Sequence, residues 1–243
     1  MRARDFSLDT LLRANAAMYA AREATVDGTQ RLNWAQLDQR VERLARWLAA
    51  RGIAPGDRVA LLLTDGAPFV TSLLACGRIG VIAVLLNWRL APGEIGWIMG
   101  NAEVSMTFAN PRFADLLTGS ATGELVMVDE HHDSHGAFES IVTVDQPPRA
   151  LPALDPDRAL YMMYTSGTTG RPKGCLQSGT AVATSALAMA LRRQWNRDTR
   201  LLSVNPLFHV VGMQQVAAML ACGGASIFAG RDDDSRAILD LLH

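Results

Sequence analysis

The clearest periodic pattern in the chain lies between residues 33 and 52. Apolar residues recur there at helical spacing, on one face: Leu37, Val41, Leu44 and Leu48. Asn33, followed three residues later by Gln36, is typical of an N-terminal capping box, and Gly52 is suited to end a helix. The pattern therefore predicts an amphipathic helix over 33–52.

After this helix, short apolar runs alternate with longer helical patterns. Strands are predicted within APGDRVALLL, VIAVLL, VSMTFA, ELVMVD, SIVTV, ALYMMY, RLLSV and ASIFAG. Helices are predicted within GAPFVTSLLACGRIG, PGEIGWIMGNA, SGTAVATSALAMALRRQW and VVGMQQVAAMLACG. Strands that are apolar throughout belong to sheets covered on both faces. The alternation predicts an α/β fold with largely parallel sheet layers flanked by helices. The proline-rich stretch DQPPRALPALDPD suggests an internal boundary near 145–157.

The amino-acid composition narrows the kinds of molecule that the protein is expected to bind. The 243 residues are 49% hydrophobic and 19% charged, with a net charge of −1, which argues against general nucleic-acid binding. The three cysteines are far apart and form neither a metal motif nor a disulfide framework. No signal peptide and no membrane-spanning run is recognisable, so a soluble, cytoplasmic protein is expected.

The segment TSGTTGRPKG follows a predicted strand and is the strongest chemical signal. Glycines 167, 170 and 174 permit close backbone approach, and successive backbone N–H groups in such a turn form a concavity that binds anions. The hydroxyl side chains add donors, and Lys173 adds a positive charge. The carboxyl edge of an open α/β sheet, where this strand delivers the loop, is where ligands bind. The segment is not a Walker A loop, because Arg171 and Pro172 separate the glycine from the lysine. Polyphosphate binding is the favoured reading, and a flexible Ser/Gly linker is the alternative.

TSGTTGRPKG resembles the signature loop of the adenylate-forming superfamily, which includes acyl- and aryl-CoA synthetases, luciferases and the adenylation domains of peptide synthetases. Three further segments resemble the same superfamily in the same order: LNWAQLDQRVERLARWLAARGIAPGDRVALLL, CGRIGVIAVLLNWRLAPGEIGWIMGNAEVSMTFA and NPLFHVVGM. The stretch from Asn87 to Leu90 is similar to the acyl-CoA synthetase branch. The resemblance covers essentially the whole chain and identifies it with the amino-terminal part of the large adenylate-forming domain.

The resemblance implies a two-step ligase reaction. A carboxylate attacks the α-phosphorus of ATP to give acyl-AMP and pyrophosphate, and the thiol of coenzyme A then displaces AMP to form a thioester. By the same resemblance, seven residues contact the β- and γ-phosphates, with Mg²⁺ bridging: Thr165, Ser166, Gly167, Thr168, Thr169, Gly170 and Lys173.

The resemblance also gives His209 a role beside the substrate carboxylate, where it helps to shape the acyl pocket. The alternative is a packed loop histidine that makes one hydrogen bond. Four neighbouring residues are then either pocket walls or ordinary core: Phe208, Val210, Val211 and Met213. One departure from the family pattern lies at the loop exit, where Ser178 is followed by Gly179 rather than by histidine.

Later motifs of the superfamily are not found in the sequence: the Tyr-Gly-x-Thr-Glu segment, the ribose-binding aspartate, the hinge and the lysine of the carboxyl-terminal lid. The remainder of the large domain and the lid are therefore expected to be absent. Three interpretations stay open: the front part of a ligase that works with a missing carboxyl-terminal half, a truncated inactive product, and a polyphosphate-binding module without catalysis. The motif alone does not establish that this chain is an enzyme by itself.

Three further features carry weaker signals. His131 and His135 are four residues apart, but an exposed polar loop explains them better than a metal site, and no metal ligand is assigned. A basic cluster either meets a coenzyme phosphate or forms a solvated helix end: Arg192, Arg193, Arg197 and Arg200. The run SRAILDLLH predicts a last amphipathic helix, and the apolar edges of an incomplete sheet invite self-association.

Overall fold

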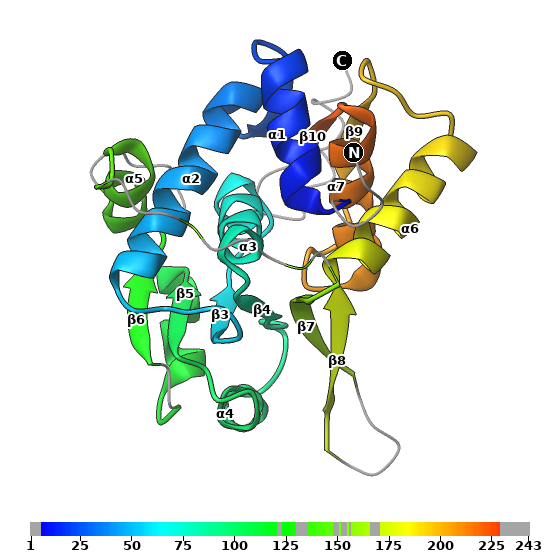
Figure 1. Ribbon diagram of the computed structural model, residues 1–243. Coiled ribbons are helices and arrows are strands. Elements are labelled where there is room, and N and C mark those ends of the chain that lie inside the picture. Colours follow the sequence, from blue (N-terminus) through cyan, green and yellow to red (C-terminus); the bar gives the residue numbers. More distant parts are fainter. Residues whose placement is uncertain are drawn as a thin grey trace.

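The computed structural model describes residues 6–120, 123–129, 136–147, 151, 155, 157–165 and 171–228 (Figure 1). Its helices are α1 (Leu8–Met18), α2 (Trp34–Ala50), α3 (Ala67–Ile79), α4 (Pro92–Asn101), α5 (Ala137–Thr143), α6 (Gly179–Arg192) and α7 (Val210–Cys222), with one 3-10 helix, η2 (Pro111–Leu117). Its strands are β1 (Glu23–Asp27), β2 (Gln30–Asn33), β3 (Arg58–Leu62), β4 (Ile82–Leu85), β5 (Met106–Ala109), β6 (Glu124–Met127), β7 (Ala159–Thr165), β8 (Lys173–Ser178), β9 (Arg200–Ser203) and β10 (Ala225–Phe228).

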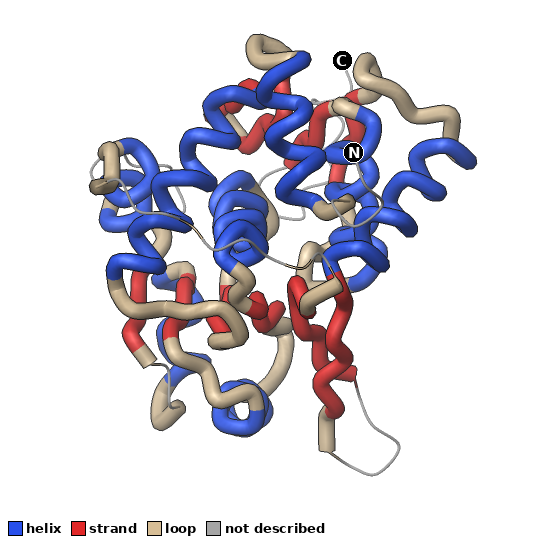
Figure 2. Tube along the Cα trace, viewed as in Figure 1, coloured by secondary structure: helices blue, strands red, loops and turns tan. Residues whose placement is uncertain are grey.

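The strands form two sheets (Figure 2). The larger sheet has the order β6-β5-β3-β4-β7-β8, and all its pairs are parallel except β7 with β8. The smaller sheet has the order β2-β1-β10-β9, with β1, β10 and β9 parallel and β2 antiparallel to β1. The predicted α/β fold with largely parallel sheet layers is confirmed. Each sheet takes strands from both sides of residues 145–157, and the boundary suggested there stays a prediction.

The larger sheet is covered on both faces. Successive residues of a strand point to opposite faces, so Val59 and Leu61 of β3 enter the main core beneath α2 and α3. Ala60 and Leu62 enter a second core, which α4 and η2 cover. Strands buried on both faces explain why the sequence shows apolar runs rather than alternation.

Helix α3 lies between the two sheets. It contacts β1 of the smaller sheet and β3, β4 and β7 of the larger one. Almost every residue of α3 is buried, as expected for a helix that is apolar all round. Its amino-terminal end approaches Asp27 of β1 closely, because the Asp27 carboxylate accepts a hydrogen bond from the Ala67 N–H at 2.9 Å. A side chain in place of Gly66 would collide with that carboxylate.

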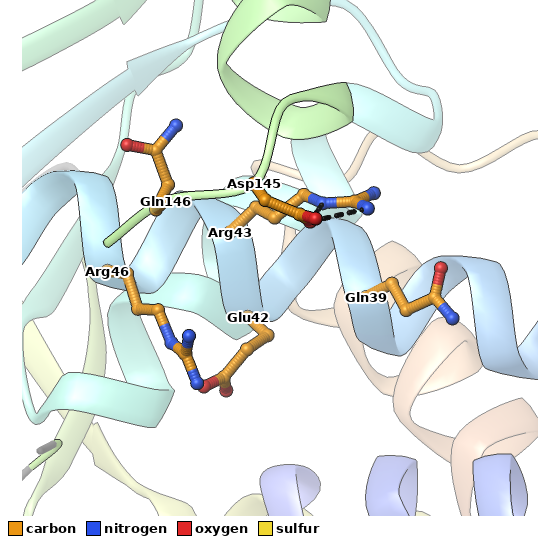
Figure 3. Close-up of a pocket in the computed structure, with 6 residues that line it drawn as sticks. All are labelled: Gln39, Glu42, Arg43, Arg46, Asp145 and Gln146. Carbon is orange, nitrogen blue, oxygen red and sulfur yellow. Dashed lines mark hydrogen bonds and ion pairs between the residues drawn. The ribbon is translucent and has the colours of Figure 1, made fainter. Parts of the chain in front are cut away.

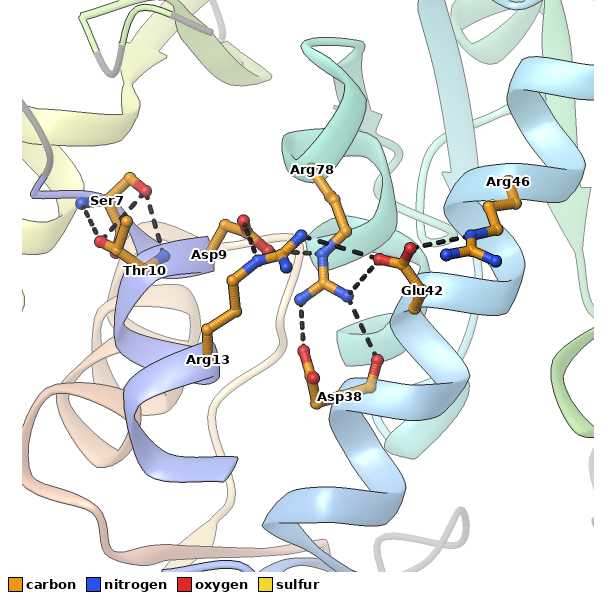
Figure 4. Close-up of polar contacts among 8 residues, drawn as sticks. All are labelled: Ser7, Asp9, Thr10, Arg13, Asp38, Glu42, Arg46 and Arg78. Carbon is orange, nitrogen blue, oxygen red and sulfur yellow. Dashed lines mark hydrogen bonds and ion pairs between the residues drawn. The ribbon is translucent and has the colours of Figure 1, made fainter. Parts of the chain in front are cut away.

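One charged group is buried at the carboxyl-terminal end of α3. The Arg78 side chain is 1% exposed and makes ion pairs with Asp9 of α1 at 2.6 Å and with Asp38 and Glu42 of α2 (Figure 4). Burial alone would lower the pKa of Arg78, but the charges of Asp9 and Asp38 and the hydrogen bonds to them outweigh it, so the pKa is raised. The guanidinium therefore stays charged and ties three helices together.

Most of the predicted helices and strands are confirmed, and one is wrong. Helix α2 begins with the predicted capping box of Asn33 and Gln36, and Gly52 after its end has a positive φ of 84°. The segment SIVTV, predicted as a strand, contributes to helix α5 instead. Phe138, Ile141 and Val142 are buried at helical spacing there, and burial against α2 outweighs the strand preference of their β-branched neighbours.

Three sequence-based predictions fall wholly or largely outside the described residues: the loop that holds His131 and His135, the middle of the predicted phosphate loop (166–170), and the last helix in SRAILDLLH. In the part of the chain that the structure describes, no helix combines the length and apolar character that crossing a bilayer requires.

Candidate functional site

The predicted phosphate loop joins the two strands of a β-hairpin. Strand β7 runs parallel to β4, so its last residue, Thr165, lies at the carboxyl edge of the larger sheet. Strand β8 returns antiparallel, and its first residue, Lys173, pairs in register with Thr165 (Figure 1). The residues Ser166, Gly167, Thr168, Thr169 and Gly170 lie outside the described residues. Of the seven predicted phosphate contacts, the structure therefore places two, and it places them opposite one another.

Both of these side chains are exposed at the hairpin. The Thr165 hydroxyl lies 3.9 Å from the Cys175 thiol, and Lys173 has no carboxylate partner among the described residues. Lys173 is also the only lysine in the sequence, since every other cationic side chain of the Lys/Arg group is an arginine. A lysine without an anionic partner is a point charge that a phosphate can engage.

Helix α4 contacts the hairpin on both of its arms. The Tyr164 hydroxyl donates a hydrogen bond to Oδ1 of Asn101 at 2.7 Å, and the Tyr164 ring meets the Trp97 ring edge-on at 6.0 Å. The guanidinium of Arg171 lies 5.9 Å from the centre of the same Trp97 ring. Tyr164 comes just before the loop and Arg171 just after its undescribed part. One helix face therefore touches the chain on either side of the loop.

The second predicted element of the site is the turn that leads into α7. His209 is the N-cap residue of α7, and its side chain is exposed and does not cap the helix. Gly212, in the first turn of α7, is buried against the preceding turn, where a Cβ would lie 2.3 Å from the carbonyl oxygen of Pro206. The glycine of the Pro-x-Phe-His-x-x-Gly motif is therefore needed for packing, in addition to being part of the pattern that resembles the family.

Loops from both sheets meet at this turn. The N–H of Leu207 donates a hydrogen bond to Oδ1 of Asp65 at 2.7 Å, and Asp65 follows the carboxyl end of β3. Leu207 itself follows the carboxyl end of β9 in the other sheet. The contact brings together the carboxyl edges of two sheets, the edge at which open α/β folds bind ligands.

An aromatic cluster connects the turn to the segment after β4. The rings of Trp88 and Phe208 meet edge-on at 5.7 Å, and Trp88 stacks on Phe113 at 5.6 Å. The His209 ring lies 4.9 Å from that of Phe208. Two segments that are distant in sequence, the one around Trp88 and the one around His209, thus lie side by side.

The four candidate pocket walls divide into two kinds. Phe208 and Met213 are buried and belong to the main core, whereas Val210 and Val211 are 55% and 48% exposed. The two valines stay available to contact a ligand. Within the described part of the chain, no hydrogen bond, ion pair or ring contact links His209 to Thr165 or Lys173, so the structure presents two separate groups of candidate residues.

A hollow of about 570 Å³ lies elsewhere, between α2 and the segment after α5 (Figure 3). Its charged groups pair with one another: Arg43 with Asp145 at 2.9 Å, and Arg46 with Glu42 at 2.8 Å. None of the sequence-predicted site residues lines it. Among the described residues, no group of three or more His, Cys, Asp or Glu side chains could hold a metal ion.

The predicted basic cluster at the end of α6 spreads over different partners. Arg193 lies over Trp195, Arg197 lies over Tyr19, and Arg200 pairs with Glu23 at 3.2 Å. Arg197 and Arg200 line a hollow of about 310 Å³ together with Arg22. Arg22 is itself bonded to Asp198 at 2.6 Å. These contacts give Arg193, Arg197 and Arg200 partners on the protein surface. The link of the four-arginine cluster, which includes Arg192, to a coenzyme stays a prediction.

Comparison with known families decides the class of the chain. The profile of the AMP-binding enzymes matches residues 12–243. The chain belongs to the AMP-binding enzyme family. The sequence-based assignment to the adenylate-forming superfamily is thereby confirmed.

Several curated relatives of this chain are CoA ligases or CoA synthases. The indoleacetate–CoA ligase of Aromatoleum aromaticum is 34% identical over 217 residues, which are 87% of this chain and 42% of the relative. The feruloyl-CoA synthase of an Amycolatopsis species is 31% identical over 215 residues, 88% of this chain and 42% of the relative. The 2-succinylbenzoate–CoA ligase of Bacillus licheniformis is 28% identical over 91% of this chain and 45% of its own length. The chain thus spans less than half the length of these relatives.

Solved structures agree with this assignment. The inhibitor-bound N-terminal domain of FACL13 from Mycobacterium tuberculosis has a TM-score of 0.83 and 26% identity, over 97% of this chain and 60% of that one. The o-succinylbenzoate CoA synthetase of Bacillus subtilis, in complex with the acyl-adenylate OSB-AMP, has a TM-score of 0.80 and 26% identity, over 96% of this chain and 58% of that one. The fold therefore matches the corresponding part of the N-terminal domain of these CoA ligases.

The sequence reasoning missed the contacts that α4 makes with the hairpin. Trp97 and Asn101 are four residues apart, which places them on one face of a helix. The signal in the sequence was a tryptophan and an amide side chain at this spacing within a predicted helix. In the structure Trp97 is half-buried against the second core, and from there Trp97 and Asn101 reach the hairpin.

Proposed function

We propose that this chain supplies the polyphosphate-binding hairpin and part of the acyl pocket of an AMP-forming ligase that joins a carboxylic acid to coenzyme A. The observation that carries the proposal is the register pair of Thr165 and Lys173 at the carboxyl edge of the larger sheet. It puts a hydroxyl group at one end of the signature loop, and at the other an ammonium group that has no carboxylate partner among the described residues. A hydroxyl donor and a point cation form a donor set that fits the β- and γ-phosphates of ATP.

The proposed reaction has two steps. A carboxylate oxygen of the substrate attacks the α-phosphorus of ATP, the bond to the bridging oxygen breaks, and pyrophosphate leaves. The sulfur of coenzyme A then attacks the acyl carbon, and AMP leaves with the electrons of the broken bond. In the first step Lys173 would hold the leaving pyrophosphate and stabilise its growing negative charge, and Thr165 would orient it by a hydrogen bond.

A Mg²⁺ ion bound to the phosphate oxygens would supply further positive charge to the same leaving group. Among the described residues, no group of three or more His, Cys, Asp or Glu side chains could hold such an ion. Lys173 is then the protein's own charge at this position, and its contribution can be measured separately.

His209 and the exposed valines beside it are the proposed contacts for the acid. The exposed imidazole of His209 lies in the turn where both sheets meet, and the edge of the aromatic cluster adjoins it. The relatives named for indoleacetate, ferulate and 2-succinylbenzoate act on acids that carry an aromatic ring. We therefore propose an aromatic carboxylic acid as the substrate class.

The single lysine allows a direct test of the nucleotide site. An amine-selective acylating reagent, followed by mass spectrometry, labels Lys173 and the α-amino group and no other side chain of the Lys/Arg group. MgATP is expected to slow the labelling of Lys173 about tenfold, which is the protection given by a charge-assisted phosphate contact. The α-amino group serves as the internal control.

Two variants complete this test. Lys173→Ala is expected to weaken ATP binding, measured by calorimetry, by about tenfold or more, because a charged hydrogen bond contributes about 1.5–3 kcal/mol. Arg31→Ala removes a charge from an exposed side chain on β2 and is expected to leave ATP binding unchanged. Labelling of Lys173 that ATP does not slow, together with equal affinities for the three proteins, would overturn the proposal.

A further inference from the structure

The hairpin that carries Thr165 and Lys173 has little support of its own. Strand β8 is the edge strand of the larger sheet and pairs only with β7 among the described strands. Its first four residues, Lys173–Leu176, are all exposed. Strand β7 pairs with β4 only as far as Met163, so beyond that residue the sheet edge is reduced to the two strands of the hairpin. Two strands alone are marginally stable, so the direction of this projecting part depends on contacts with the rest of the molecule.

Helix α4, whose own position is fixed by buried apolar residues, provides such contacts. Its buried residues Ile95, Ile98 and Met99 pack into the second core under β3 and β4. Met162 and Tyr164 of β7 pack against the same core. The position of α4 relative to the sheet is therefore set by apolar burial, independently of the hairpin's tip.

Two side chains on the hairpin-facing side of α4 reach both arms of the hairpin. Trp97 touches Tyr164 on the outgoing arm and Arg171 on the returning arm, through an edge-on ring contact and a cation–π contact. Asn101, one helical turn later, accepts the hydrogen bond from the Tyr164 hydroxyl. Each such contact is modest, but together they are a large share of the local stability of a segment that is otherwise only two-stranded.

Glycine at position 174 lets the hairpin keep this contact. A Cβ there would lie 2.7 Å from the Met162 sulfur and 3.2 Å from Cζ of Tyr164. With no side chain at 174, the Tyr164 ring lies across β8 and directs its hydroxyl to α4. The absence of a side chain at Gly174 thus leaves the space that the Tyr164 ring occupies.

We infer that Trp97 and Asn101 are positioning residues, which set the direction of the β7–β8 hairpin and so place Thr165 and Lys173 for the nucleotide. The inference rests on the proposed function, because it assigns these residues to the same site. It goes beyond that function by placing control of nucleotide affinity in a helix that does not belong to the signature loop.

The test compares two tryptophan variants of the full 243-residue chain. Trp97→Leu keeps an apolar side chain, though a smaller one, and loses both ring contacts with the hairpin. Trp47→Leu is the matched control, because Trp47 also lies under an arginine, Arg51 at 4.3 Å, and contacts one aromatic ring, that of Phe108. The control tryptophan is on α2, away from the hairpin.

Hydrogen exchange of the hairpin is the first measurement. In Trp97→Leu, backbone amides of β7 and β8 in peptides covering 161–165 and 173–176 are expected to exchange about tenfold faster, while those of β3 and β4 keep their rates. Trp97→Phe, which retains an aromatic ring, is expected to restore most of the protection. Equal exchange of the hairpin in Trp97→Leu and Trp47→Leu would overturn the inference.

Nucleotide affinity is the second measurement. The dissociation constant for ATP is expected to rise about tenfold in Trp97→Leu and severalfold in Tyr164→Phe, which loses only the hydroxyl that reaches Asn101. It is expected to stay unchanged in Trp47→Leu. A hairpin that exchanges faster with no change in ATP affinity would also overturn the inference.

The two proposals fail in distinguishable ways. If the unaltered chain binds no ATP and Lys173 labelling is insensitive to it, the proposed function fails. The exchange rates of the hairpin still decide whether α4 sets its direction. If ATP binds and Lys173→Ala weakens it, but the two tryptophan variants behave alike, the proposed function stands and the positioning role fails.

Discussion

Helix α3 and the β7–β8 hairpin are opposite in their surroundings. Almost every residue of α3 is buried between the two sheets, whereas the first four residues of β8 are exposed. The two regions also differ in how their positively charged side chains are paired. Arg78 is held by three carboxylates, and Lys173 has none among the described residues. Stability is concentrated in the helix layer, and the candidate chemistry is placed where local stability is low.

This difference shows how one chain separates two uses of positive charge. A buried cation must be neutralised by its own protein, because an unpaired charge inside the fold is very costly. A cation that serves a ligand must be left without an internal partner, which is tolerable only in water. The burial of each side chain therefore indicates its use, and three changes test that reading.

The largest effect is expected from Arg78→Met. The substitution leaves the carboxylates of Asp9, Asp38 and Glu42 close together without their shared cation. Because these carboxylates are about a quarter exposed, the loss should be at the low end for a broken buried ion pair, about 3 kcal/mol in the free energy of unfolding. Urea unfolding at neutral pH measures it.

The matched control is Arg13→Met. Arg13 contacts Asp9 and Glu42 of the same network, but its side chain is 51% exposed. A loss below about 1 kcal/mol is expected for such a surface pair. Equal losses from the two substitutions would contradict the view that burial determines the effect of each arginine.

An intermediate effect is expected from alkaline pH, through Cys76 of α3. Burial raises the pKa of the Cys76 thiol from about 9 to about 12. The unfolded chain therefore loses this proton at lower pH than the folded protein, and stability is lost as pH rises from about 9 towards 12. Between pH 8 and pH 10.5 the loss from this group should be about 2 kcal/mol.

Urea unfolding of Cys76→Ala at the two pH values isolates this contribution. The variant should lose about 2 kcal/mol less than the unaltered chain over the same interval. An unchanged pH dependence of stability in Cys76→Ala would contradict the assignment of this loss to the buried thiol.

The smallest effect is expected in the hairpin itself. Leu176 of β8 is 54% exposed, so Leu176→Ala should change the free energy of unfolding by no more than about 0.5 kcal/mol. Leu61→Ala, at a fully buried position of β3, should cost at least about 2 kcal/mol, the low end for such a truncation. Thermal unfolding of both variants makes the comparison. A loss above about 1 kcal/mol for Leu176→Ala would show that this face is covered in the protein.

Elements with a strong periodic pattern could be predicted from the sequence. The capping box of Asn33 and Gln36 satisfies local backbone groups, so it needs no knowledge of the rest of the fold. The apolar strands β3, β4 and β5 were recognisable because both faces of each are buried. Membership of the family followed from the signature loop, and the match over residues 12–243 confirmed it.

Elements whose structure depends on distant partners could not be predicted in the same way. Strand β8 is exposed and contains a glycine, and only its pairing with β7 makes it a strand. Helix α5 was read as a strand because its burial against α2 is a tertiary contact. The support of the hairpin by Trp97 likewise joins residues whose proximity no local pattern records. The roles assigned to Thr165, Lys173 and His209 stay predictions until the nucleotide is tested.

The pairing of β1 with β10 has a consequence for biosynthesis. Thr25 lies beside Ser226 in the smaller sheet, so its strand is made long before its partner. At roughly 5–20 residues per second, a ribosome needs about 10–40 s to produce the intervening chain. During that interval β1 and β2 have emerged with an open edge, and the smaller sheet closes only when nearly all of the described residues have been translated. The larger sheet and the helices that cover it are therefore expected to fold on the ribosome before the smaller sheet does.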